Sequence, residues 1–163
     1  MKTVAGIGKW FWAGCIAVTL LNAAIFRVRA NRRIEEQPEL EEGYGRIIKG
    51  FAIWGSLPWV VMGIGCTIGD VPSVLHYFRP RDGNPYVIAF FASIFFIYGL
   101  GTYWLFARNG AEMLTRHRGL FNVDFKSPLM VKLFWLLLVT GGMAGVLVML
   151  LLDIPLPEQL QNR

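Results

Sequence analysis

The stretch LFWLLLVTGGMAGVLVMLLL, residues 133–152, contains no Asp, Glu, Lys, Arg or His. A helix of about 20 mostly apolar residues crosses the roughly 30 Å of hydrocarbon in a bilayer. A strand of a membrane barrel would alternate apolar and polar residues, whereas this stretch is apolar on every face. Because a segment in lipid must pair its own backbone groups, we predict a transmembrane helix here.

Three further stretches have the same character and contain none of these five residue types. They are Trp10–Phe26, Phe51–Ile68 and Tyr86–Ala107. Of the 163 residues, 55% are hydrophobic and only 17% are charged, against roughly a quarter charged in soluble domains. We therefore predict an all-α fold: residues 1–163 form a single transmembrane domain, an integral membrane four-helix bundle.

The first stretch has some features of a secretory signal, since Lys2 and Lys9 lie before it. However, Lys9 interrupts the apolar run, and Trp12 stands where a lipoprotein cleavage box would place a small aliphatic residue. We expect a retained helix.

Basic residues predict the orientation of the four helices. Eleven of the 16 Lys and Arg residues follow the first and the third apolar stretch. Positive charge near span ends favours the cytoplasmic side. We therefore expect a multi-pass protein of the bacterial inner membrane with both termini extracytoplasmic.

The net charge of +5 does not indicate nucleic-acid binding, because no separate basic domain is present. Basic residues at helix ends meet anionic lipid head groups, each contributing about 1 kcal/mol. We expect membrane lipids as partners, and no nucleic acid.

The segment from Arg27 to Lys49 begins basic, becomes acidic around Pro38 and ends basic. Charge patterning favours a solvated helix extension followed by a turn. The alternative is a docking surface for a partner. The acidic residues in this segment are Glu35, Glu36, Glu39, Glu41 and Glu42.

The segment Asp70–Pro85 predicts a short interfacial helix between the second and third spans. Asp70 would cap this helix and Pro72 would occupy its first turn. A tight turn at Asp82–Pro85 would lead into the third span. The residues expected on one apolar face, at i, i+3, i+4 and i+7, are Val71, Val74, Leu75 and Phe78.

Two interpretations of this segment remain open. In the first, its aromatic residues anchor the chain at the membrane interface and its arginines contact lipid phosphate. In the second, polar side chains gather around an anionic ligand or a partner, since Arg binds phosphate in a bidentate manner and His titrates near neutral pH. The candidate contact residues are Asp70, His76, Tyr77, Arg79 and Arg81.

Cofactor ligands are scarce in the sequence. His76 and His117 would lie on opposite sides of the membrane, and a metal site needs several converging ligands. Cys15 and Cys66 both lie in spans, where buried Cys usually acts as a small hydrophobic residue. We therefore expect neither a metal nor a cofactor.

The sequence motifs do not identify a family. The chain lacks the Cys-x-x-Cys pair of four-helix disulfide-generating oxidoreductases. It also lacks the intramembrane Glu of small multidrug exporters and the intramembrane His pair of b-type cytochromes.

Small residues four apart occur in the spans, where they allow helix backbones to approach closely. The pairs are Gly65 with Gly69, and Gly141 with Gly145. The absence of charge inside the spans argues against a proton-coupled pump. The sequence favours a non-enzymatic accessory, assembly or scaffold subunit that contacts other membrane proteins or self-associates.

Two alternative functions remain. A small oligomeric transporter or channel is suggested by Pro58, which should bend the second helix, and by the Ser, Thr and Tyr residues of the spans. A membrane enzyme acting on a lipid head group at the extracytoplasmic surface would use His76 as base. Arg79 and Arg81 would then hold the phosphate.

Overall fold

The computed structural model describes residues 2–121, 123 and 125–152, with side chains from residue 8 onward. Its described part consists of helices and connecting segments, with no strand. The long helices are α1 (Lys2–Glu36), α2 (Glu41–Thr67), α3 (Pro85–Ala107) and α5 (Pro128–Leu151). The short elements are η1 (Pro38–Leu40), η2 (Val74–Phe78), η3 (Pro80–Asp82) and α4 (Gly110–Arg116).

The four long helices are long and apolar enough to cross a membrane. This confirms the all-helical prediction with four candidate spans and indicates a polytopic membrane protein. The helices exceed the predicted apolar stretches: α1, at 35 residues, is about 50 Å long at 1.5 Å per residue. The charged residues after Phe26 therefore continue α1, as predicted for a solvated extension of the first helix. A short connection through η1 then leads to α2.

Side-chain caps and prolines determine where α3 and α5 begin. The Asn84 side chain accepts hydrogen bonds from the backbone N–H groups of Tyr86 (2.9 Å) and Val87 (3.4 Å), and Pro85 follows as the first helical residue. Gly83 has a left-handed φ of +70°, which glycine adopts without steric cost. The predicted tight turn before the third span is thus confirmed.

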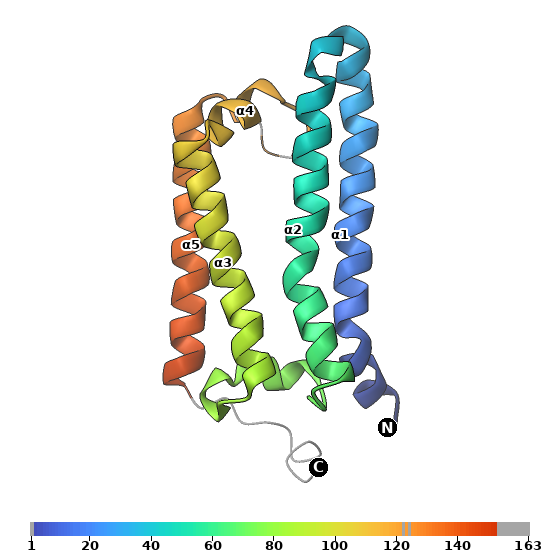
Figure 1. Ribbon diagram of the computed structural model, residues 1–163, viewed down its shortest axis with the longest axis vertical. Helices are drawn as coiled ribbons and strands as arrows, with labels where there is room; N and C mark the ends of the chain where they lie inside the picture. Colours follow the sequence, from blue (N-terminus) through green and yellow to red (C-terminus); the bar gives the residue numbers. More distant parts are fainter. Residues whose placement is uncertain (1, 122, 124, 153–163) are drawn as a thin grey trace.

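The long helices lie side by side, as Figure 1 shows. The helix α1 packs on α2, α2 on α3, and α3 on α5, while α4 contacts both α3 and α5. The loops with η2 and η3 lie at the lower end in Figure 1, called the His76 end below. The opposite end, with η1 and α4, is called the basic end.

Buried side chains form three clusters near the two ends. One cluster lies at the His76 end and joins α2, α3 and the loop between them. The other two lie at the basic end, where Leu114 and Phe121 pack against both. The buried residues of the His76-end cluster are Met62, Cys66, Val71, Tyr77, Val87, Phe90 and Phe91.

Rings lie against glycines where the helices meet. The indole of Trp12 on α1 lies on Gly63 of α2. A Cβ atom added at residue 63 would lie only 2.8 Å from the indole ring. Between α3 and α5 the arrangement is reciprocal: Trp135 lies against Gly101, and the Tyr98 hydroxyl lies against Gly142. A Cβ at any of these three glycines would collide with the ring, so the helix approach depends on them.

Candidate functional site

Ser73, rather than Asp70, caps the short helix at the His76 end. The Ser73 hydroxyl oxygen accepts a hydrogen bond from the backbone N–H of Leu75 at 3.2 Å, and this oxygen lies 3.4 Å from Nδ1 of His76. Asp70 instead has a left-handed φ of +51° at the end of α2. The predicted Asp70 cap was wrong because the chain turns sharply at that residue.

The predicted apolar face of this segment was also wrong. The helix η2 is a 3-10 helix of five residues, in which side chains three apart lie on one face. Val71, Val74 and Tyr77 follow that spacing and pack in the His76-end cluster. Leu75 and Phe78, which α-helical spacing placed on the same face, are exposed.

Tyr77 is a structural residue of this end. Its side chain is 3% exposed, and its hydroxyl donates a hydrogen bond of 3.0 Å to the Met62 carbonyl oxygen on α2. The ring packs edge-on against Phe90 of α3, at 5.2 Å between centroids. Burial raises the pKa of the Tyr77 hydroxyl, because the charged phenolate would lose its hydration.

The remaining candidates of the loop do not converge on one point. Arg79 forms an ion pair with Asp82, with 3.3 Å between Nε and the carboxylate. Asp70 and Arg81 are exposed. Neither residue makes a hydrogen bond or ion pair with His76 in the part of the chain that the structure describes.

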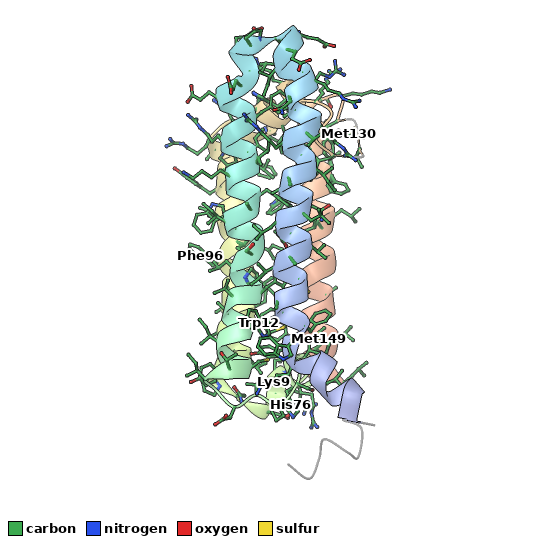
Figure 2. The ribbon with its side chains drawn as sticks, turned by 90° about the vertical axis from the view of Figure 1, so that its right-hand side faces the viewer. Lys9, Trp12, His76, Phe96, Met130 and Met149 are labelled. Atoms are coloured by element: carbon green, nitrogen blue, oxygen red, sulfur yellow. The ribbon has the colours of Figure 1, made fainter. Side chains whose placement is uncertain are left out.

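The first turns of α1 join this end, which the sequence did not indicate. Gly8 lies against Ser73: a Cβ atom added at residue 8 would lie 3.5 Å from the Ser73 Cβ. Figure 2 shows Lys9, Trp12 and His76 at the same end of the molecule. The only sequence signal was a lysine interrupting an apolar run one helical turn before a tryptophan.

A second polar constellation lies at the basic end, around His117. This imidazole is 7% exposed, and its Nδ1 lies 2.7 Å from the Met113 carbonyl oxygen. The ring packs edge-on against Tyr44, at 4.8 Å between centroids. The Tyr44 hydroxyl in turn donates a 2.8 Å hydrogen bond to the Arg118 carbonyl oxygen.

This constellation ties the segment after α4 onto the α1–α2 pair. Arg29 on α1 donates a 3.0 Å hydrogen bond to the Leu120 carbonyl oxygen. The Leu120 side chain is fully buried among residues of α1 and α2, including Ala30 and Ile47. Sequence reasoning treated His117 as a lone histidine, because nothing local indicates that Gly43 and Tyr44 lie beside it.

The predicted packing glycines have different surroundings. Gly65 faces Tyr77 and Tyr86, and Gly69 faces the ring of Tyr86. By contrast, no atom lies within 4 Å of a Cβ built at Gly141 or Gly145. These two glycines therefore contact no other helix of the described chain.

The described residues hold no group of three or more His, Cys, Asp or Glu side chains arranged to bind a metal. Cys15 and Cys66 are free thiols. Comparison with protein-family models, with curated proteins and with solved structures finds no match for this chain.

Proposed function

We propose that this chain is an accessory, assembly or scaffold subunit of the bacterial inner membrane, with both termini extracytoplasmic. Its four helices would form a membrane bundle that offers the outer face of α5 to another transmembrane helix. This helix would belong to a partner protein or to a second copy of the chain.

The open strip at Gly141 and Gly145 on α5 is the observation that carries this proposal. Where glycines of this chain face a neighbouring helix, as at Gly63, Gly101 and Gly142, a ring covers them. Gly141 and Gly145 have the spacing that lets two helix backbones approach, yet the described part of the chain leaves them uncovered. Large exposed side chains flank them: Phe134, Leu137, Leu138, Val148 and Leu152.

The chemistry of the spans supports the same proposal. The four apolar stretches contain no ionisable Asp, Glu, Lys, Arg or His, the residue types that mark ion paths in membranes. The polar side chains within them largely bond to their own helix: Thr19 donates to the Cys15 carbonyl and Thr102 to the Tyr98 carbonyl. Such groups are satisfied locally, which suits a packing role.

Association measurements in lipid test the proposal. The double variant Gly141→Ile with Gly145→Ile fills the strip with branched side chains. We expect it to abolish co-purification of the partner, or self-association measured by energy transfer between labelled chains in vesicles. The matched control is Ala92→Ile, because Ala92 is also small and exposed but lies on α3. Equal association of the double variant and the wild type would overturn the proposal.

A small transporter is the second candidate, favoured by one observation in α2. Among the described residues, the buried Ser56 hydroxyl oxygen has no hydrogen-bond partner. Pro58, two residues later, has no N–H, so the Trp54 carbonyl loses its usual helical donor. An unsatisfied hydroxyl beside this proline, near the middle of a span, would suit a permeating polar solute. Solute flux into vesicles containing the protein, compared between wild type and Ser56→Ala, would decide; no flux excludes this candidate.

A further inference from the structure

We propose that the His76 end binds the phosphate of an anionic phospholipid head group, held by Lys9, Trp12 and His76. This inference concerns a different surface from the α5 strip and does not depend on the proposed scaffold role.

Two segments far apart in sequence bring these three side chains to one end. Lys9 and Trp12 lie three residues apart on α1, so they are neighbours on the helix surface. The helix contacts η2 through Gly8 and Ser73, and Ser73 contacts His76. In Figure 2 the labelled side chains of Lys9, Trp12 and His76 all lie at this end of the molecule.

Two of these side chains, Trp12 and Lys9, carry hydrogen-bond donors that lack protein acceptors among the described residues. The Trp12 indole nitrogen is buried and has no hydrogen-bond partner among the residues that the structure describes, although buried donors are almost always paired. The exposed Lys9 forms no ion pair within the described residues. An oxyanion would supply the missing acceptors.

In one of its two neutral tautomers, His76 adds a third donor. The Ser73 oxygen already accepts the Leu75 N–H, and its own hydrogen is available for His76 Nδ1. When Nδ1 accepts that hydrogen, a neutral imidazole carries its proton at Nε2. The His76 ring then offers an N–H at Nε2.

The position of the site favours a lipid phosphate over a free anion. Lys9 and His76 lie where the apolar part of α1 begins, the level at which head groups meet a spanning helix. Further along the bundle toward its middle, Trp12 and Met149 both pack against the His76-end cluster and offer apolar surface to an acyl chain.

Nuclear magnetic resonance of the full chain in neutral micelles tests this assignment. The protein has two histidines, and His117 lies at the far end, where it serves as an internal reference. Titration with phosphatidylglycerol should shift the His76 ring and Trp12 indole signals and leave the His117 signal unchanged. Phosphatidylcholine should produce neither shift at the same concentrations.

Variants distinguish a built site from diffuse attraction. Lys9→Gln should weaken phosphatidylglycerol binding about tenfold, the usual loss for one charge-assisted hydrogen bond. Trp12→Phe keeps a ring over Gly63 but removes the donor, and it should also weaken binding. Arg81→Gln removes an exposed cation of the same loop and should change nothing. The unchanged His117 signal reports that each variant is folded.

Three results would overturn the inference. They are unchanged His76 and Trp12 signals on addition of phosphatidylglycerol, equal weakening by Arg81→Gln and Lys9→Gln, or equal shifts with inorganic phosphate alone. The last result would identify a site for free anions instead of a lipid head group.

Discussion

The imidazole of His117 lies directly against the backbone of Gly43, so that a Cβ at residue 43 would overlap its Nε2 atom. The ring cannot easily turn aside. Its Nδ1 is held at the Met113 carbonyl, and its face is set by Tyr44. A glycine at the start of α2 is therefore what allows the segment after α4 to dock on the α1–α2 pair.

Gly43→Ala should destabilise the protein by about 1–3 kcal/mol, the usual cost of overpacking. Thermal unfolding in detergent measures this change. Gly45→Ala is the matched control, because it lies two residues further along α2 and a Cβ there meets nothing within 4 Å. That variant should keep wild-type stability or exceed it by up to about 1 kcal/mol, since Ala is the better helix former. Equal losses for both variants would contradict the His117 contact.

Tyr44→Phe should loosen the segment after α4 without unfolding the spans. The variant removes the hydrogen bond to the Arg118 carbonyl, worth about 1 kcal/mol. Hydrogen exchange of the backbone amides at residues 117–121 should accelerate about five- to tenfold. Tyr103→Phe, an exposed tyrosine on α3, should leave these rates unchanged. Unaltered exchange in Tyr44→Phe would show that the hydroxyl does not hold the segment.

Gly101→Ala should separate α3 from α5. The new Cβ would overlap the Trp135 ring, which is fixed by its 2.9 Å hydrogen bond from Nε1 to the Thr102 hydroxyl. We expect a loss of about 1–3 kcal/mol in unfolding measurements. Gly99→Ala on the same helix faces open space and should cost nothing. A loss of the same size at residue 99 would mean that the glycines matter for helix flexibility rather than for ring packing.

Alkaline pH should destabilise the His76 end through Tyr77. Its pKa is raised in the folded state by burial, so folding favours the protonated hydroxyl. This contribution is complete below the unfolded pKa, near 10, and decreases as the pH rises toward the folded value. Tyr77→Phe should be less stable at pH 8, where the bond to Met62 is lost. It should also lose less of its melting temperature between pH 8 and pH 11 than the wild type does. Parallel pH curves for both proteins would contradict this role.

The sequence predicted the four long apolar helices well, because the composition of a candidate span is a local property. Each apolar stretch, such as Tyr86–Ala107, can be identified without knowing its neighbours. The predicted turn at Asp82–Pro85 was an equally local feature. These elements follow from residues adjacent in the chain.

Contacts between distant segments were not predictable in this way. Nothing near His117 in the sequence indicates Gly43, and nothing near His76 indicates Lys9. The 3-10 geometry of η2 also escaped prediction, because Val71, Val74 and Tyr77 fit a spacing of three while Leu75 and Phe78 fit an α-helix. The pairs of glycines four residues apart could be identified in the sequence. The sequence did not indicate that Gly142, rather than Gly141, faces α3.

Membrane topology tests most directly the central claim that the long helices cross the bilayer, and the positions below test it for α2 and α3. In a variant with Cys15 and Cys66 replaced by Ala, single cysteines are placed at Gln37, at Asp82 or at Lys126, all exposed positions. They are then labelled with a membrane-impermeant maleimide. We predict that residue 82 is labelled from outside the cell, whereas residues 37 and 126 are labelled only in inverted vesicles. Labelling of residues 37 and 82, or of 82 and 126, from the same side of a sealed membrane would contradict the account.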